Sequence, residues 1–440
     1  MSEADKPHST SESDGLRTAQ EPRLRIRDVD RPRSRVPIHV IVALPLALIG
    51  LIALLATGNA LRPFESITVI EARMGSKSDY FEDPEVQRLL LKHGLVVVIR
   101  RLGSRSIAMQ SLEGLDVVFP SGQPASELIR QLIRKRQGPP PNSMSPFVTP
   151  LVLGTFRAYA ETLVERGVAT RQPAESGGET LYYDLDMQKF IQLLDNLPDS
   201  YSYGRAEGAD TWNGLGFDKH PGRSNSGRVM VRTSSVCESN SAATYLSILA
   251  FVANGNKPPG AGKASKAEEM REAGQVAEKI KPLINIQGLE AAEQDEGYFS
   301  HDGENMAPIV LKYEHQYLAY QIEYEQKRHR PDTNRVLLYP TPHALTEPQL
   351  ISLSSKGDRL VDLVKKDSEL RQRAIELGFR VSFSEEDGTS NPLNNYMRKQ
   401  GIQVPNPNHD EIKVSEPNLD VLEQMIKSVG SCEAAGQDAE

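Results

Sequence analysis

The stretch Ile67 to Gln123, ITVIEARMGSKSDYFEDPEVQRLLLKHGLVVVIRRLGSRSIAMQSLEGLDVVFPSGQ, decides the fold. Three short apolar runs in it, ITVIEA, LVVVI and LDVVF, are predicted strands, and a helical segment separates the first two. Asp83 can cap that helix, Pro84 suits its first position, and Gly94 suits its exit. Short strands that alternate with helices indicate an α/β domain.

The same alternation continues along the chain. Further strands are predicted at 145–154, 229–233 and 334–340. Further helices are predicted at 121–137, 156–167, 184–196, 239–255, from about 264 to Lys281, and at 358–378. The Gly, Asp, Asn and Ser-rich stretch 200–228 is a predicted loop.

The composition is that of a globular protein, with 440 residues, 38% hydrophobic and 25% charged. At roughly 150 residues per domain, this length allows two or three domains. The chain has 51 Lys and Arg against 59 Asp and Glu, so its net charge of −8 argues against nucleic-acid binding. Cys237 and Cys432 are far apart, and two cysteines are too few for a disulfide scaffold, so we expect both to be free.

Residues 36–61 contain no Asp, Glu, Lys or Arg and are long enough to span a bilayer. A buried core helix is the alternative interpretation. Pro45 and Gly50 agree with a membrane helix, in which both residue types are common. More basic residues precede this run, namely Arg23, Arg25, Arg27, Arg31, Arg33 and Arg35, than follow it closely, namely Arg62, Arg73 and Lys77. The positive-inside rule therefore predicts a cytoplasmic N-terminus and an extracytoplasmic remainder.

The polar residues before the apolar run decide between an anchor and a cleaved leader. A signal peptide normally has a shorter leader than 1–35, so we expect an uncleaved signal anchor at 36–61. Cleavage near Gly58-Asn59-Ala60 remains the alternative. Residues 1–35 are rich in Ser, Asp, Glu, Arg and Pro, which predicts a disordered cytoplasmic tail. The protein is thus expected in the cell membrane, with a single span.

Three turns share one pattern, in which an apolar strand runs into small, hydroxyl-rich residues that open a helix. They are Gly75 to Ser78, Phe119 to Gln123, and Thr233 to Ser241. The N-terminus of a helix offers backbone N–H groups and partial positive charge, so such turns can hold an oxyanion without formal cations. Ligands of open α/β sheets bind at the carboxyl ends of strands. The alternative is that these Ser and Asn residues only cap helices.

The common catalytic and metal-binding patterns are absent from the sequence. It has no G-x-S-x-G, Walker loop or H-E-x-x-H, and its nine histidines are scattered. Cys237 could be a nucleophile but is more typical of a buried thiol. Glu314 could accept a ligand or serve a structural role at a strand edge, and Trp212, Tyr201 and Tyr203 could line a pocket or pack a loop. We expect no enzyme activity, no cofactor and no metal.

The order of several segments resembles extracellular solute-binding proteins with the two-lobed type 2 periplasmic-binding fold. The matching segments are the turn at Gly75-Ser76, the run Asp116 to Gly122, the crossing strand Ser145 to Val148, Thr233 followed by Ser239 to Leu246, Pro308 to Gln316, and Leu338 to Pro342. One departure is Ser234-Ser235-Val236-Cys237, where related proteins often carry an Asp and basic residues. The charge of the ligand is therefore left open.

The resemblance implies an α/β two-lobed fold preceded by one transmembrane helix. Lobe one would comprise 62–142 and return at 335–429 with the C-terminal helices, lobe two would comprise 143–334, and 430–440 would be a polar tail. Two crossing segments would form the hinge. Carried over residue by residue, the ligand-binding residues would be Gly75, Ser76, Ser121 and Gly122 from lobe one, and Thr149, Ser239, Asn240, Ser241 and Glu314 from lobe two or the hinge.

The function expected on this basis is capture of a small polar or anionic solute between two lobes, for transport or sensing. The lobes would close as rigid bodies without covalent chemistry. Its partner would be a membrane permease or a receptor subunit. Two other functions stay open: an envelope scaffold or interaction protein that keeps the fold without a ligand, and an exported hydrolase.

Overall fold

The computed structural model describes residues 67–135, 140–174, 178–195, 211–285, 289–290, 296–381, 391–405 and 413–432. The chain divides into two units, Met1–Glu65 and Ser66–Glu440, and every described residue belongs to the second. The predicted tail 1–35 and anchor 36–61, and the end of the chain after Cys432, lie outside the described residues. No helix among the described residues is long and apolar enough to cross a membrane.

The first sheet has five strands in the order β2-β1-β3-β13-β4. Its strands are β1 (Thr68–Met74), β2 (Leu95–Arg101), β3 (Val117–Phe119), β4 (Ser143–Met144) and β13 (Leu350–Ser352). β1 pairs in parallel with both β2 and β3, whereas β13 runs antiparallel to β3. The helix between β1 and β2 is confirmed, because Asp83 caps α3 (Pro84–Lys92) by accepting hydrogen bonds from two backbone N–H groups.

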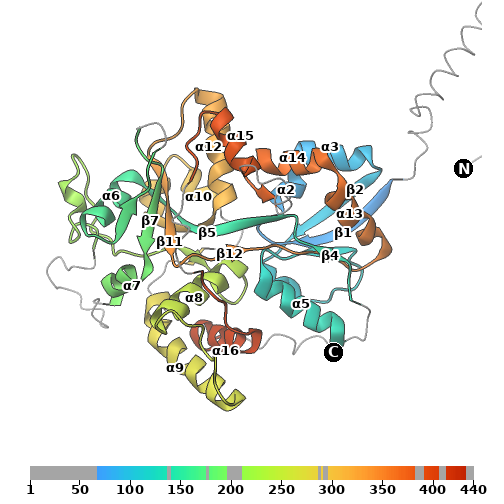
Figure 1. The fold of residues 1–440 in the computed structure, drawn as a ribbon, viewed down its shortest axis with the longest axis horizontal. Coiled ribbons are helices and arrows are strands. Elements are labelled where there is room, and N and C mark those ends of the chain that lie inside the picture. Colours follow the sequence, from blue (N-terminus) through green and yellow to red (C-terminus); the bar gives the residue numbers. More distant parts are fainter. Residues whose placement is uncertain are drawn as a thin grey trace, which may run out of the picture. The chain divides into compact units, whose positions relative to one another are not determined.

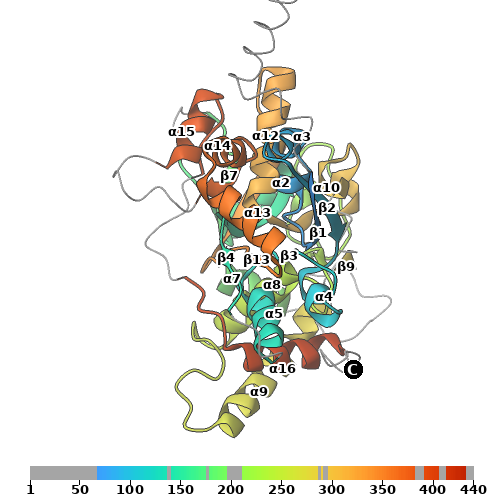
Figure 2. The same ribbon diagram turned by 90° about the vertical axis from the view of Figure 1, so that its right-hand side faces the viewer.

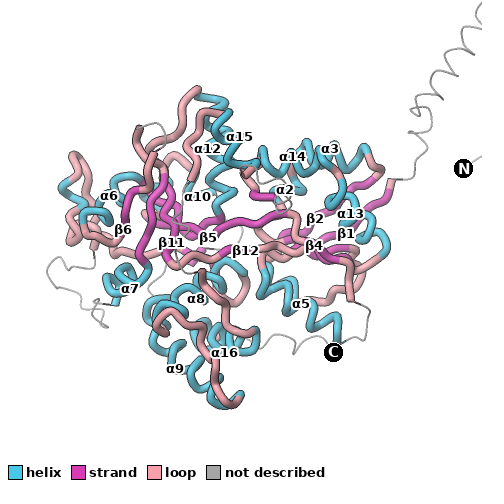
Figure 3. Tube along the Cα trace, in the orientation of Figure 1, coloured by secondary structure: helices cyan, strands magenta, loops and turns pink. Residues whose placement is uncertain are grey.

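The second sheet has the strand order β10-β5-β11-β7-β6, and β12 and β14 pair with β5 beyond this path. Its strands are β5 (Phe147–Phe156), β6 (Ala169–Arg171), β7 (Tyr182–Asp186), β10 (Ile309–Tyr313), β11 (Arg335–Thr341), β12 (Leu345–Thr346) and β14 (Arg380–Val381). A short pair joins β8 (Thr233–Ser234) to β9 (Leu289–Glu290). Figures 1 and 3 show β5 running from the second sheet toward the first. The predicted α/β class, with two sheets, is confirmed.

Helices cover both sheets (Figures 1 and 2). Those not yet bounded are α2 (Asp79–Glu82), α4 (Ser104–Met109), α5 (Gln123–Lys135), α6 (Arg157–Glu165), α7 (Met187–Asp195), α8 (Asn240–Ala253), α9 (Lys266–Asn285), α10 (Glu296–Phe299), α11 (Gly303–Met306), α12 (Glu314–Arg328), α13 (Ser355–Lys366), α14 (Ser368–Glu376), α15 (Pro392–Lys399) and α16 (Leu419–Gly430). Apolar residues of α3, α13 and α14 pack together in one core with the first sheet, and residues of α4 and α5 pack in a smaller core with β3 and β13. We call this first sheet with its helices lobe one, and the second sheet with its helices lobe two.

Two of the segments that connect the lobes run side by side. Along β5, Phe147 packs in the core of lobe one, whereas Leu151 packs in the core of lobe two. The chain returns from Ala344, in the core of lobe two, to Leu350, in the core of lobe one. The returning segment pairs with β5 through Leu345, so the two connections run antiparallel and side by side.

The C-terminal half departs from the predicted domain boundaries. β11 lies in the second sheet between β5 and β7, so the chain does not return to lobe one at residue 335. The return begins near β13, and the chain leaves lobe one again, because Leu393 of α15 and Met425 of α16 pack in the core of lobe two. Apolar stripes specify that these helices are buried but not against which sheet, which is why the sequence did not place them.

Three predicted elements also differ in their limits. The predicted helix 184–196 begins as strand β7, and α7 starts only at Met187. Of the predicted strand 229–233, only Thr233 belongs to a strand. The predicted helix 358–378 is split at Asp367, whose side chain accepts a hydrogen bond from the Leu370 N–H and caps a second helix.

The two cysteines are not free, contrary to the prediction. Cys237 and Cys432 form a disulfide, with their Cα atoms 5.6 Å apart. The reason is tertiary: α16 packs against α8 and α9, which brings the end of the described chain back to the segment before α8. Distance along the sequence did not indicate this proximity.

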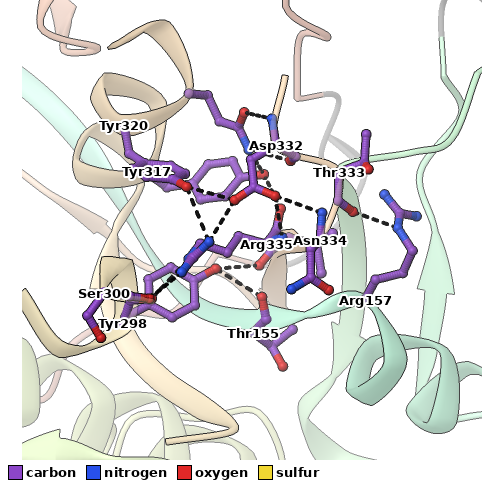
Figure 4. A network of polar contacts seen from close by, with 12 residues as sticks. Thr155, Arg157, Tyr298, Ser300, Tyr317, Tyr320, Asp332, Thr333, Asn334 and Arg335 are labelled. Carbon is purple, nitrogen blue, oxygen red and sulfur yellow. Dashed lines mark hydrogen bonds and ion pairs between the residues drawn. The ribbon is translucent and has the colours of Figure 1, made fainter. Parts of the chain in front are cut away.

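A polar network fixes the turn between α12 and β11 (Figure 4). Arg335 Nη1 lies 2.8 Å from Asp332 Oδ2, and the Tyr320 hydroxyl donates to the same carboxylate over 2.7 Å. Tyr298 donates from its hydroxyl to the backbone oxygen of Thr155, which ties the segment before β10 to β5. These groups satisfy one another, so the network has a structural role at this turn.

Candidate functional site

A cavity of about 100 Å³ lies between the two lobes. On the side of lobe one it is lined by the residues that follow β1 and β2, where parallel strands present their carboxyl ends. On the side of lobe two it is lined by the segment from β8 to the start of α8 and by the end of β10. The lining residues are Gly75, Ser76, Ser78, Arg101, Leu102, Gly103, Ser104, Arg232, Thr233, Ser234, Ser239, Asn240, Ser241, Leu311, Lys312, Tyr313 and Gln316.

Three turns of lobe one meet at Gly75. The Oγ atoms of Ser76 and Ser121 are 2.9 Å apart, and the Ser121 N–H donates to Ser104 Oγ over 2.9 Å. A Cβ atom on Gly75 would lie 2.2 Å from Ser104 Oγ and 2.5 Å from Ser121 Oγ. Only glycine leaves room for these hydroxyls to approach the backbone that lines the cavity.

The wall from lobe two is the first turn of α8. Ser239 caps this helix, since its Oγ accepts from the Ala242 N–H over 3.1 Å and from Ser234 Oγ over 2.6 Å. Asn240 and Ser241 follow in the first turn. Because the helix has 14 residues, its N-terminus carries partial positive charge close to the cavity.

Cations add to that charge. Arg101, Arg232 and Lys312 all line the cavity, and none of its described lining residues is acidic. Lys312 is almost wholly buried, with 3% of its surface exposed. Arg101 also forms an ion pair with Glu82, which does not line the cavity. Three cationic residues therefore belong to the wall of the cavity.

Lys77 adds a fourth cation behind the lining. It is fully buried, and its Nζ donates to the Ser121 carbonyl oxygen over 2.7 Å. The same nitrogen lies 3.1 Å from the centre of the Tyr313 ring, across the two lobes. A cation over an aromatic ring is attracted to the ring face, so this contact favours the approach of the lobes.

The sequence did not assign these cations to the site. We expected an anion to be held without formal charges, and Arg232, Lys312 and Lys77 were not among the candidates. The only available signal was their proximity to predicted strand ends, since Arg232 directly precedes β8 and Lys312 lies near the end of β10. Strand ends alone do not say which strands face each other.

Of the nine predicted ligand-binding residues, the structure brings five together. Gly75, Ser76, Ser239, Asn240 and Ser241 line the cavity. Ser121 lies behind Ser76 and positions it.

Gly122 lies where the lobes touch. A Cβ atom on Gly122 would be 2.2 Å from the Asn240 side-chain nitrogen, so this turn packs directly against the start of α8. Gly122 does not line the cavity.

Thr149 and Glu314 do not line the cavity. The Thr149 Oγ1 lies 3.3 Å from His315 Nδ1. The Glu314 carboxylate is buried and accepts two hydrogen bonds from Arg380, over 2.6 and 2.8 Å, and one from the Tyr339 hydroxyl over 2.6 Å. Burial alone would lower the pKa of Arg380, but the Glu314 carboxylate raises it, so the guanidinium stays charged. Glu314 joins α12, β11 and β14 near the interlobe connection.

The remaining candidates have structural positions. Trp212 is buried and packs edge-to-face with Tyr159, so it packs a loop. Tyr201 and Tyr203 lie outside the described residues. Cys237 is bonded to Cys432 and is not a free nucleophile. Within the described part of the chain, no group of three or more His, Cys, Asp or Glu side chains could hold a metal ion.

No family model matches this chain, and no curated protein matches it. Several solved structures are similar to it at low sequence identity. One is the periplasmic binding protein P5PA, with 12% identity, a TM-score of 0.43, and coverage of 82% of this chain and 96% of that one. Another is the sulfate-binding protein SubI from Mycobacterium tuberculosis H37Rv, with 12% identity, a TM-score of 0.40, and coverage of 81% and 96%. A third is iron-bound HitA from Pseudomonas aeruginosa, with 11% identity, a TM-score of 0.44, and coverage of 82% and 97%. At such identities the ligand residues of these proteins do not transfer to this chain.

Proposed function

We propose that this protein is a membrane-anchored solute-binding protein that captures a small oxyanion between its two lobes. One observation carries the proposal: the lining of one cavity includes Arg101, Arg232, Lys312 and the N-terminus of α8, and its described residues include no carboxylate. An anion entering this site exchanges its hydration shell for fixed hydrogen-bond donors. Such charge-assisted bonds are about twice as strong as neutral ones.

The size of the cavity favours a small ligand. Its volume of about 100 Å³ is well below the roughly 300 to 1,000 Å³ of sites for drug-sized molecules. The lining offers hydroxyls from both lobes, of which Ser76 and Ser241 are examples. A compact oxyanion that accepts several hydrogen bonds fits this composition better than an apolar molecule does.

The same lining favours capture over hydrolysis. A hydrolase needs a general base within hydrogen-bond reach of its nucleophile. The described lining contains hydroxyls but no His, Asp or Glu. The cycle that we propose is binding in an open cleft, closure of the lobes about the two connecting segments, and release on reopening.

The proposed location is the outer side of the cytoplasmic membrane, through the anchor at 36–61. The Cys237–Cys432 disulfide supports it, because disulfides persist in oxidising compartments and are rare in the cytosol. A membrane permease or receptor subunit is the proposed partner. Protease treatment of intact cells tests the location: it should remove the bulk of the chain, and full protection would refute an extracytoplasmic domain.

A thermal-shift screen of the compact unit Ser66–Glu440 tests the function. Sulfate, phosphate, carboxylates, sugars and metal cations should be compared at matched ionic strength, after native mass spectrometry has shown that no ligand is retained. A ligand at 100 times its Kd stabilises by about 2.7 kcal/mol, which shifts the melting temperature by several degrees. Stabilisation by an oxyanion alone supports capture. The absence of any stabilising solute would favour the envelope-scaffold function.

Variants then assign the site. Ser76→Ala and Ser241→Ala should each weaken anion binding by about 1 kcal/mol, the value of an ordinary hydrogen bond, and leave the fold intact. Arg232→Gln should weaken it more, because a charge is removed from the cavity wall. Calorimetric titration measures these effects, and unchanged affinity in the double serine variant would remove both hydroxyls from the site.

A further inference from the structure

The C-terminal helix α16 bridges the two lobes. It packs on α8 and α9 of lobe two and also touches α5 of lobe one (Figures 1 and 2). Its end is tied to lobe two by the disulfide between Cys432 and Cys237. At Gly430 a Cβ atom would lie 2.7 Å from both Cys432 Sγ and a methyl group of Val236, so the helix end is closely seated there.

Arg105 joins this assembly from lobe one. It follows the lining residue Ser104, and only 1% of its surface is exposed. Its guanidinium donates two hydrogen bonds to the Glu423 carboxylate of α16, over 2.5 and 2.7 Å. Its Nε lies 3.3 Å from the Cys237 carbonyl oxygen, and its backbone N–H donates to the Glu238 carbonyl oxygen over 2.9 Å.

Two of these contacts, those to Cys237 and Glu238, act on the segment that opens α8. Residues 237 and 238 directly precede the cap Ser239, so Arg105 holds the N-terminal turn of α8 at a fixed distance from lobe one. Separation of the lobes at this edge breaks the bonds from Arg105 to residues 237 and 238 and strains its pair with Glu423. A buried guanidinium that loses its partners is strongly unfavourable.

We infer that Arg105 is a positioning residue that sets the distance between the lobes at the cavity, and that disulfide-tethered α16 supplies the carboxylate that fixes it. The expected effect of Arg105 on the affinity for an anion rests on the proposed anion capture, because closure of the lobes determines that affinity. Arg105, Glu423 and Cys432 do not line the cavity. Their variants therefore change closure without changing what the anion touches.

The test is a distance measurement between the lobes. Spin labels at Lys135 of α5 and Gln275 of α9, both exposed, report the separation by pulsed electron resonance in the full chain held in lipid nanodiscs. Glu423→Gln should add a population at longer distance. The matched control is Lys266→Gln, which removes an ion pair from α9 of lobe two to Asp420 of α16 and leaves the pair of Arg105 with Glu423 in place. It should leave the distances unchanged.

A second variant keeps the test independent of the ion pair. The double change Cys237→Ser and Cys432→Ser leaves Arg105 and Glu423 in place but releases the end of α16, and it should broaden the distances in the same direction. Sulfate and phosphate titrations on the same variants should show affinity lower by about tenfold, within the range usual for coupled sites. The Lys266→Gln control should keep the affinity of the unaltered protein.

The outcomes separate this inference from the proposed function. Distances in Glu423→Gln and in the double serine variant that equal those of the unaltered protein overturn the role of Arg105 and α16. Longer distances in both variants support it, even where neither sulfate nor phosphate binds the unaltered chain. In that case it is the proposed capture of these oxyanions that fails.

Discussion

Gly103 is the position at which a single methyl group should separate the lobes. It lies between β2 and α4, and its Cα faces the backbone of lobe two. A Cβ atom there would be 2.5 Å from the Glu238 carbonyl oxygen and 3.0 Å from its carbonyl carbon. These are backbone atoms that cannot rotate away, so Gly103→Ala forces either the turn or the lobe to move.

The size of the effect follows from that distance. Ordinary contacts begin near 3.4 Å, so the shortfall is 3.4 − 2.5 = 0.9 Å. Overpacking of this kind costs about 1 to 3 kcal/mol. The Arg105 N–H bond to Glu238, 2.9 Å long, would stretch at the same time. In the proposed function only the closed arrangement holds the anion on both sides, so we expect Gly103→Ala to weaken anion binding about 5- to 150-fold.

Gly274→Ala is the matched control. Gly274 lies within α9, no heavy atom lies within 4 Å of an added Cβ, and its φ is not positive. Alanine in a helix interior is more favourable than glycine by about 0.5 to 1 kcal/mol, so this variant should be more stable and bind anions unchanged. Calorimetric titration with the anion found in the screen, together with urea unfolding, measures both quantities.

The result that refutes the reasoning is an unchanged affinity in Gly103→Ala with normal folding. It would mean that the lobes do not approach here when the anion is bound. A loss of affinity in both glycine variants would point instead to a general disturbance of the protein.

Three further predictions concern stability. Burial raises the pKa of Glu416 from about 4.5 to about 7, so ionisation disfavours the folded state and the free energy of unfolding falls as pH rises between these values. Glu416→Gln should therefore gain about 3 kcal/mol at pH 8 and nothing at pH 4 in urea unfolding. An equal gain in stability at pH 8 and at pH 4 would exclude ionisation of Glu416 as the cause. Burial would raise the pKa of Asp332, but hydrogen bonds from Tyr320 and Arg335 lower it. The stability that the Asp332 carboxylate contributes is therefore present above its pKa in the unfolded chain and is lost as pH falls through its pKa in the folded protein. Asp332→Asn should cost about 3 kcal/mol at pH 7, and a cost that persists at pH 2 would contradict the pairing. Reduction of the Cys237–Cys432 disulfide should cost about 2 to 5 kcal/mol, and an unchanged melting temperature in a thiol-treated sample, with reduction verified by mass, would show that the bridge does not stabilise the fold.

Local signals predicted several individual elements correctly. Asp83, Pro84 and Gly94 specify α3, and Ser239 specifies the start of α8, because caps and first-turn residues act within a few positions along the chain. The split at Asp367 was within reach of the same rules, since Asp followed by Ser offers a second cap. β11 was predicted as a strand but placed in the wrong lobe, because an apolar run does not name its neighbour.

Local signals also predicted part of the candidate site, whereas contacts between distant residues decided the rest. Hydroxyl-rich turns after strands correctly marked residues near the interlobe cavity, including Gly75 and Ser241. The roles of Gly122 and Glu314 differ from expectation because their partners, Asn240 and Arg380, are distant in sequence.

The sequence by itself determined the alternation of strands and helices, the caps, and the charge-free run at 36–61, since each depends on residues near one another in the chain. Only the tertiary structure decided which strands share a sheet, that Cys237 meets Cys432, and that Arg232 and Lys312 face one cavity with Gly75. The physical reason is that these relations depend on which apolar faces pack together over separations of many tens to hundreds of residues. Local periodicity specifies that a face is buried, and the packed core selects its partner.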